Sequence, residues 1–221
     1  MAIRSVIFAK DEYYHIYNRG NGKREIFHDA EDYNRLAGLL YACNQEGNFS
    51  SKSLSKTEGL FQAKVVNPIV AIGAYCIMPN HFHLIVTELG TGGISRFMQK
   101  VSTAYAMYYN KKYKRTGVLF EGKFKAKHCD SDEYLKYLFS YIHLNPVKLI
   151  DPRWKEVGIK NKEESIHYLK NYIHSSFLDY MGEESPRNKV INRALFPEYF
   201  PNKEMFLQEI FNWMDFGYEL R

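Results

Sequence analysis

Two histidines separated by a single residue, His81 and His83, have a spacing that could support metal chemistry. They follow the continuous apolar run 69–78, which predicts a buried strand, and a Pro-Asn turn. In a second strand over 81–88, residues two apart point to the same side, so the two imidazoles would lie next to each other. Neutral imidazole nitrogens are good ligands for Mn²⁺, Zn²⁺ and Co²⁺. The pair therefore predicts a cation site on a rigid sheet, although two exposed histidines on a surface strand would give the same pattern.

A tyrosine and an asparagine, Tyr141 and Asn145, would meet if residues 131–145 are helical. Residues four apart lie on one face of a helix, with Cβ atoms ~5–6 Å apart, so a phenol and an amide oxygen would face the same point. His143 is expected on a different face, at the helix surface. The alternatives are that Tyr141 packs in a core and that Asn145 ends the helix before Pro146.

These two pairs together describe one reaction. Two imidazoles from a sheet and one amide oxygen from a helix make a three-ligand cation site with open positions. A divalent ion held there would polarise a phosphodiester, and a tyrosine one helical turn from the amide could attack the phosphorus. A free phenol has a pKa of about 10 and is a poor nucleophile, so a nearby cation would help. The combination predicts phosphodiester chemistry through Tyr141, with His81, His83 and Asn145 as metal ligands.

Positive charge is concentrated in one part of the chain. The net charge of the 221 residues is +5, but the segment 96–127 alone carries nine lysines and arginines and a single acid, Glu121. Tyrosines and phenylalanines are interleaved with these charges, which is typical of a nucleic-acid-binding surface. A solvated helix end followed by a lysine-rich edge strand is the alternative. The basic residues that we expect to contact DNA in this segment are Lys111, Lys112, Lys114, Arg115, Lys123, Lys125 and Lys127.

The remaining pattern predicts the elements that position these residues. We expect a strand over 13–19, a helix over 30–46 capped by Asp29, the two strands 69–78 and 81–88, and a helix over 94–112. A strand over 118–129 with a kink at Gly122 and a helix over 131–145 capped by Asp130 follow. This order predicts an α+β fold, an antiparallel sheet with helices on one face.

The chain divides into two regions by composition. Residues 1–150 form the predicted catalytic domain, with 47–68 as a loop or insertion. Residues 151–221 form a helical C-terminal extension, with an amphipathic stretch at 163–172 and a final helix over 203–216. The three cysteines form no CxxC pair, and no apolar run approaches the roughly 20 residues of a membrane span. We therefore expect a soluble protein of a reducing compartment.

Several stretches resemble the HUH-type Y1 transposases, which include the IS200-like and the REP-associated tyrosine transposases. The resemblance covers roughly residues 12–182 and is most specific in its ordered pair of motifs, PNHFHL at 79–84 and YIHLNPVK at 141–148. The stretches YHIYNRG at 14–20, GVLFEGKF at 117–124 and SSFLDYMG at 175–182 also match the family's pattern.

The resemblance implies a ferredoxin-like (RRM-like) sheet and a metal-dependent endonuclease and strand transferase for single-stranded DNA. Tyr141 would form a 5′-phosphotyrosine and leave a free 3′-OH, and Asn145 would complete an Mg²⁺ or Mn²⁺ site with His81 and His83. Substrates of the family are imperfect DNA hairpins with a short guide sequence at their foot. The resemblance also implies a location in the bacterial cytoplasm, in association with the nucleoid. The resemblance suggests Asn18, Arg19, Lys23 and Arg24 as contacts near that foot. The long C-terminal region departs from the minimal members, so a monomer is expected as readily as a homodimer.

Two other functions fit the same residues. A domesticated protein could retain the fold and the affinity for hairpin DNA without turnover, but a pure binding protein has no need of the set His81, His83, Tyr141 and Asn145. A metal-dependent RNA nuclease that uses water would retain cleavage in a Tyr141→Phe variant, whereas the tyrosine transposase would lose it.

Overall fold

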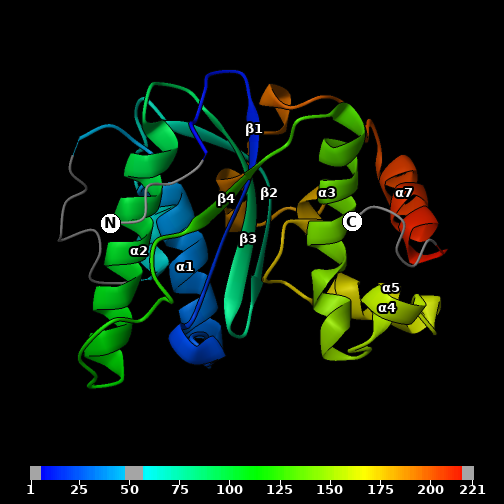
Figure 1. The fold of residues 1–221 in the computed structure, drawn as a ribbon, viewed down its shortest axis with the longest axis horizontal. Coiled ribbons are helices and arrows are strands. Elements are labelled where there is room, and N and C mark those ends of the chain that lie inside the picture. The colour runs from blue at the N-terminus through cyan, green and yellow to red at the C-terminus, as the bar shows by residue number, and fades with distance from the viewer. Residues whose placement is uncertain (1–5, 48–56, 216–221) are drawn as a thin grey trace.

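A computed structural model describes residues 6–47 and 57–215, and its centre is a four-stranded antiparallel sheet with the strand order β2-β3-β1-β4. The strands are β1 (Tyr13–Arg19), β2 (Val70–Met78), β3 (His81–Glu88) and β4 (Lys125–His128). Helices α1 (Ala30–Ala42) and α2 (Gly93–Lys112) lie between β1 and β2 and between β3 and β4. This βαββαβ order gives the ferredoxin-like topology, so the predicted α+β class is confirmed (Figure 1).

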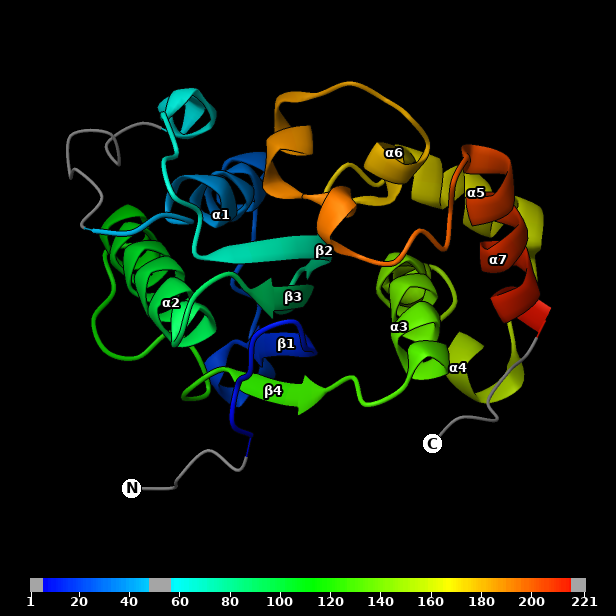
Figure 2. The same cartoon turned by 90° about the horizontal axis from the view of Figure 1, so that it is seen from above.

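The two faces of the sheet are covered by different parts of the chain. Helices α1 and α2 cover one face, and α3 (Asp132–Leu144) with the segments that follow it covers the other (Figure 2). Alternate residues of β3 separate accordingly, because Phe82 and Leu84 pack with α1 and α2 whereas Ile85 packs with α3. The sequence predicted helices on one face only. The second layer forms because β2 is apolar on both sides, and Ala71 and Ala74 must also be covered.

The C-terminal part of the chain packs against α3 and the edge of the sheet. It contains α4 (Trp154–Val157), α5 (Lys162–Asn171), α6 (Phe177–Tyr180) and α7 (Lys203–Asp215). Phe177 and Phe206 are fully buried in the core that α3 shares with β2. Residues 174–176 run along the outer edge of β2, where the Ile77 amide donates to the His174 carbonyl at 2.9 Å. The C-terminal part therefore holds α3 against the sheet.

Three predicted elements differ in detail from the structure. The helix predicted over 30–46 ends at Ala42, with Cys43 as its C-cap. The strand predicted over 118–129 is reduced to the four residues of β4, because Gly122 has a φ of 141° and the chain leaves the sheet there. The cap of α3 is Ser131 and not Asp130, since the Ser131 hydroxyl accepts from the Tyr134 amide at 3.2 Å. In the predicted loop 47–68, residues 48–56 lie outside the described residues.

The remaining expectations concern cysteines and membrane spans. Cys43, Cys76 and Cys129 are free thiols, and all three are buried. Within the described parts of the chain, no helix has the length and apolar character needed to cross a membrane.

Candidate active site

The histidine pair lies at the start of β3, on the side of the sheet that faces α3. In the sheet register, His81 is opposite Arg19 and His83 is opposite Tyr17, so the pair sits beside the last residues of β1. The two imidazole centroids are 4.9 Å apart. His83 is 7% exposed, and Phe82 between them is fully buried on the opposite side. The two imidazoles therefore lie side by side on β3, as the sequence predicted.

A third histidine, His15 of β1, fixes the orientation of His83. Nε2 of His15 and Nδ1 of His83 form a 2.8 Å hydrogen bond. With its proton on Nδ1, His83 donates this bond and keeps the lone pair of its own Nε2 for a cation. Burial, helped by the positive charges of Lys127 and Lys155, lowers the pKa of His15 to about 3. The spacing of residues along the sequence gave no indication of this role for His15, because His15 lies 68 residues before His83 and contacts it from the neighbouring strand.

Burial keeps the two predicted ligand histidines neutral. It lowers the pKa of His81 to about 4, with Lys155, Lys148 and Arg19 adding to the effect. It also lowers the pKa of His83 well below its usual range, with the nearby His15 and His81 contributing. Neutral imidazoles are the form that binds metal ions, so both side chains are in the required state at pH 7.

Helix α3 presents Tyr141 and Asn145 to the same region. The Tyr141 ring centroid lies 5.8 Å from that of His83. Nδ2 of Asn145 donates to the Tyr141 carbonyl at 2.8 Å, which leaves Oδ1 of Asn145 for a partner outside the helix. Asn145 still has helical φ and ψ angles of −52° and −40°, so the one-turn relation between the two side chains holds up to the proline.

A lysine from the C-terminal part completes this arrangement. Nζ of Lys155 donates to Tyr141 Oη at 2.8 Å and to Asn145 Oδ1 at 3.1 Å. Burial, together with the charge of Lys148, lowers the pKa of Lys155 to about 8. The sequence analysis missed this residue, because only the tertiary packing of α4 brings it to Tyr141.

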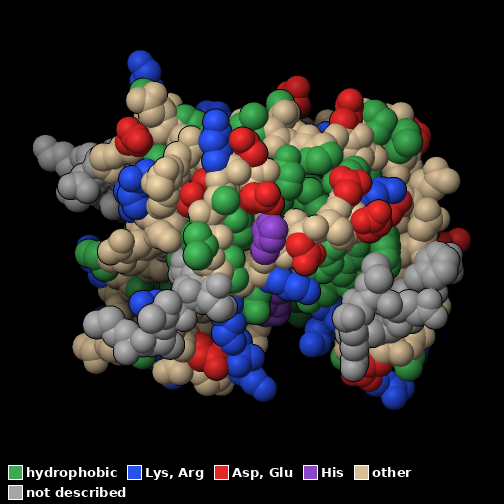
Figure 3. Space-filling view, turned by 45° about the horizontal axis from the view of Figure 1, so that its top comes forward, with side chains coloured by type: hydrophobic (Ala, Val, Ile, Leu, Met, Phe, Trp, Pro, Cys, Tyr) green, Lys and Arg blue, Asp and Glu red, His purple; other side chains and the backbone are tan. Residues whose placement is uncertain are grey.

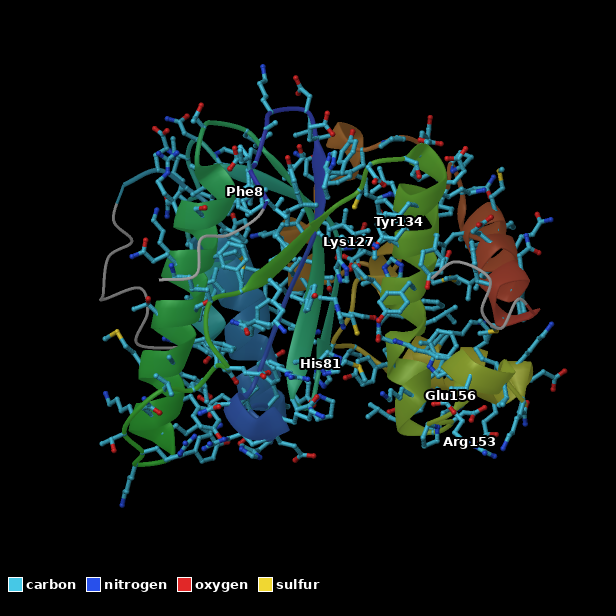
Figure 4. The ribbon with its side chains drawn as sticks, in the orientation of Figure 1. Phe8, His81, Lys127, Tyr134, Arg153 and Glu156 are labelled. Atoms are coloured by element: carbon cyan, nitrogen blue, oxygen red, sulfur yellow. The ribbon has the colours of Figure 1, made fainter. Side chains whose placement is uncertain are left out.

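These side chains line one open cleft of about 680 Å³. Its walls include His81, His83, Tyr141, Asn145 and Lys155, so all four predicted catalytic and metal-binding residues are brought together. In Figure 3, Lys and Arg side chains gather on both sides of a notch that contains histidine. In Figure 4, His81 lies at the lower end of the sheet, and Glu156 marks α4 on the other side of α3.

The donor set of the cleft suits a hard or borderline divalent cation. His81 and His83 supply neutral nitrogens, and Asn145 supplies an amide oxygen that already accepts from a cation, the Lys155 ammonium. Among residues 6–47 and 57–215, no group of three or more His, Cys, Asp and Glu side chains is placed to hold a metal. A cation held by His81 and His83 would need a third ligand of another kind, and Asn145, the ligand expected from the sequence, lines the same cleft.

The residues expected to contact DNA separate into two groups. One group lines the cleft and consists of Asn18, Arg19, Lys23, Lys123 and Lys125, joined by Lys148 and Lys155, which the sequence did not single out. Arg19 is paired with Glu121, which neutralises its charge. The Asn18 side chain ties the end of β1 to the loop through a 3.2 Å bond from Nδ2 to the Gly122 carbonyl.

The other group lies away from the cleft. Lys111 and Lys112 end α2, and Lys114 and Arg115 follow it. Lys112 is held by Asp29, Glu31 and the buried Asp32, at 2.8, 3.1 and 2.9 Å. Arg115 stacks over Tyr109, Arg24 bonds to the Asn21 carbonyl, and Lys127 lies 4.3 Å from the Tyr134 ring centroid. The structure thus does not bring these six residues, Arg24 and Lys127 included, to the candidate site.

His143 is not at the helix surface, where the sequence analysis placed it. It is fully buried, and its Nε2 lies 2.8 Å from the Ser176 hydroxyl. Burial lowers its pKa to about 3. The prediction was wrong because α3 is packed on two sides, by the sheet and by the C-terminal helices.

A family model described as "Transposase IS200 like" matches residues 9–145. The chain belongs to the IS200-like transposase family. The match begins just before β1 and ends at Asn145, so it contains the histidine pair and Tyr141, whereas Lys155 lies beyond it. A comparison with curated proteins gives no match.

Solved structures give a fold relationship for this IS200-like transposase over most of its length. A REP-associated tyrosine transposase bound to a REP hairpin is 14% identical, with a TM-score of 0.52 and 89% of each chain covered. The tRNA(His) guanylyltransferase of Saccharomyces cerevisiae is 12% identical over 90% of this chain and 86% of that chain, with a TM-score of 0.37. The first similarity shows a shared fold that extends past residue 145 into the C-terminal part.

Proposed function

We propose that this transposase is a metal-dependent endonuclease and strand transferase that cuts single-stranded DNA near hairpins through Tyr141. The observation that carries the proposal is that one cleft collects His81, His83, Tyr141 and Asn145. The bound hairpin of the REP-associated relative supports a structured single strand as substrate, and membership of the family supports a DNA-cleaving activity.

The proposed reaction is a transesterification. Tyr141 Oη forms a bond to the phosphorus, and the bond from phosphorus to the 3′ oxygen breaks, which gives a 5′-phosphotyrosine and a 3′-OH. One phosphodiester replaces another, so the step requires no nucleotide hydrolysis. Strand transfer is the reverse step with a different 3′-OH, and Tyr141 is then the leaving group.

The residues of the cleft would have different roles in this reaction. His81, His83 and Asn145 would hold Mg²⁺ or Mn²⁺, which acts as a Lewis acid on the scissile phosphate. His15 orients His83 through its ring hydrogen bond. Lys23, Lys123 and Lys125 line the cleft walls and would bind the phosphate backbone on either side of the cut.

A denaturing gel tests the proposal directly. Wild type is incubated with labelled single-stranded hairpins from the flanks of its own gene, in Mg²⁺ or Mn²⁺. We expect a labelled covalent protein–DNA band that disappears in Tyr141→Phe and remains in Tyr137→Phe, a matched change one helical turn earlier and outside the cleft. DNA binding by Tyr141→Phe should remain within about threefold of wild type.

The metal component has its own controls. EDTA and His83→Ala should both remove the covalent band, while His128→Ala should not, because His128 pairs with Glu12 outside the cleft. Cleavage retained in Tyr141→Phe would favour the RNA-nuclease type of chemistry with water. Binding in a native gel without any covalent band, for several hairpins and both metals, would favour a domesticated binding protein.

A further inference from the structure

The hydroxyl of the proposed nucleophile is held by a lysine from outside the region that the family model matches. Lys155 Nζ lies 2.8 Å from Tyr141 Oη and 4.0 Å from the centroid of the Tyr141 ring. We propose that Lys155 is a second catalytic side chain, which fixes the Tyr141 hydroxyl and faces its oxygen with a positive charge. This inference rests on the proposed function, because it assigns a role in the same reaction.

The polar partners of Lys155 indicate a role in the site and not a structural ion pair. Within the described residues, no carboxylate forms an ion pair with Lys155, and its hydrogen bonds go to Tyr141 and to Asn145 Oδ1 at 3.1 Å. By contrast, Lys112 is surrounded by the carboxylates that anchor the start of α1. A half-buried ammonium normally needs such a counter-charge. At Lys155, a phosphate in the cleft and negative charge on Tyr141 Oη would supply it.

The fold fixes Lys155 through its neighbour in the sequence. Trp154 begins α4 and is 8% exposed in the core shared with α3 and α5. This anchor places the next residue over the Tyr141 ring, where Nζ can donate to both Oη and Oδ1. A lysine has three N–H donors, so one donor remains for a phosphate oxygen.

The position of the charge suits both directions of the reaction. During cleavage, the phenol proton passes to solvent, the resulting phenolate Oη bonds to phosphorus, and the 3′ oxygen leaves with the electron pair and takes up a proton. During strand transfer, the incoming 3′-OH loses its proton and Oη leaves phosphorus with the electron pair. Negative charge is carried by Oη at the start of the first step and at the end of the second. A fixed ammonium at that oxygen stabilises it in both.

The test compares single-turnover rates of covalent adduct formation by the full-length protein on the labelled flanking hairpins, with Mn²⁺ and saturating DNA. We expect Lys155→Met to slow the adduct by about 100-fold, the size of effect seen when one donor to a developing oxyanion is removed. Lys160→Met should stay within about threefold of wild type. It removes the same charge from the same region but lies outside the cleft.

Chemical rescue separates catalysis from folding. In Lys155→Cys, alkylation of the new thiol with 2-bromoethylamine restores an ammonium at nearly the same distance from the backbone. The native Cys43, Cys76 and Cys129 are buried, and burial raises the pKa of the Cys43 thiol to about 11 and of the Cys129 thiol to about 12, so they should not react. We expect alkylated Lys155→Cys to recover at least tenfold in rate, while treated and untreated wild type stay equal.

Each outcome has one meaning. A Tyr141-dependent adduct in wild type that forms equally fast in Lys155→Met and Lys160→Met would overturn the role of Lys155 and leave the proposed function standing. A slow Lys155→Cys that the ethylamine group does not restore would also overturn it, since the loss would then be structural. No adduct in wild type on any flanking hairpin would overturn the proposed function, and this role with it.

Discussion

The cleft, and not the basic end of α2, should set the salt dependence of DNA binding. Six basic side chains line the cleft, namely Arg19, Lys23, Lys123, Lys125, Lys148 and Lys155, and Glu121 neutralises the first of them. If each of the other five contacts one phosphate of a single strand, log K should fall with log salt with a slope of about −3.5. Changing Lys123 and Lys125 together to Gln should reduce the slope to about −2.1.

These slopes predict affinities that differ clearly in a simple titration. Between about 50 and 200 mM salt, wild-type affinity should fall by about 130-fold, and that of the double variant by about 20-fold. The measurement is fluorescence anisotropy with a labelled hairpin, with all proteins in the Tyr141→Phe background so that cleavage does not interfere. The matched control, Lys111→Gln with Lys114→Gln, removes the same charge from the end of α2 and should leave the slope unchanged. A control pair that lowers the slope as much as the cleft pair would refute the assignment of the interface to the cleft.

Two predictions concern the packing around α3. First, burial lowers the pKa of His143 from its ordinary 6.5 to about 3, so the stability that it contributes is present above pH 6.5 and is lost as the pH falls towards 3. Between pH 7 and pH 5, the free energy of unfolding measured in urea should fall by about 2 kcal/mol because of this group. This contribution should be absent in His143→Gln and retained in His167→Gln, a change at an exposed position. Second, Phe206 of α7 is fully buried against Phe177 and Tyr180, so Phe206→Ala should cost about 3–5 kcal/mol in one cooperative urea transition. Phe211→Ala, on the same helix but 37% exposed, should cost less than about 1.5 kcal/mol, and two separate transitions in either variant would mean that the C-terminal part folds on its own.

Sequence reasoning succeeded where a local pattern determines the structure. The period of two in β3 places His81 and His83 on one side, and the period of α3 places Tyr141 above Asn145. The run before the Pro-Asn turn is long and apolar enough to define β2 within one residue. In these cases, neighbours in the sequence are also neighbours in space.

The same reasoning failed where the contacts of a side chain are made with residues far away in the sequence. Nothing near Lys112 shows that it belongs to Asp32, 80 residues earlier, and not to DNA. His143 was expected on a surface because the apolar stripe of a helix usually marks its only buried side. Helix α3 is buried on two sides, and the second is created by α6 and α7. Lys155 reaches Tyr141 for the same reason, since its position follows from the burial of Trp154 and from no spacing within the motif.

The geometry of the candidate site consequently depends on the C-terminal part of the chain, which contains neither the histidine pair nor the proposed nucleophile. The sheet supplies the imidazoles and α3 supplies the phenol and the amide, but the distance between sheet and helix is set by the core that both share with α6 and α7. A residue such as Phe206 therefore bears on catalysis without touching the cleft, because a shift of α3 moves Tyr141 relative to His83. A displacement of about 1 Å can cost about 100-fold in rate when a nucleophile must approach phosphorus in line. Loss of packing in the C-terminal part should accordingly lower the rate of adduct formation before it lowers the affinity for DNA, which depends mainly on charges along the cleft.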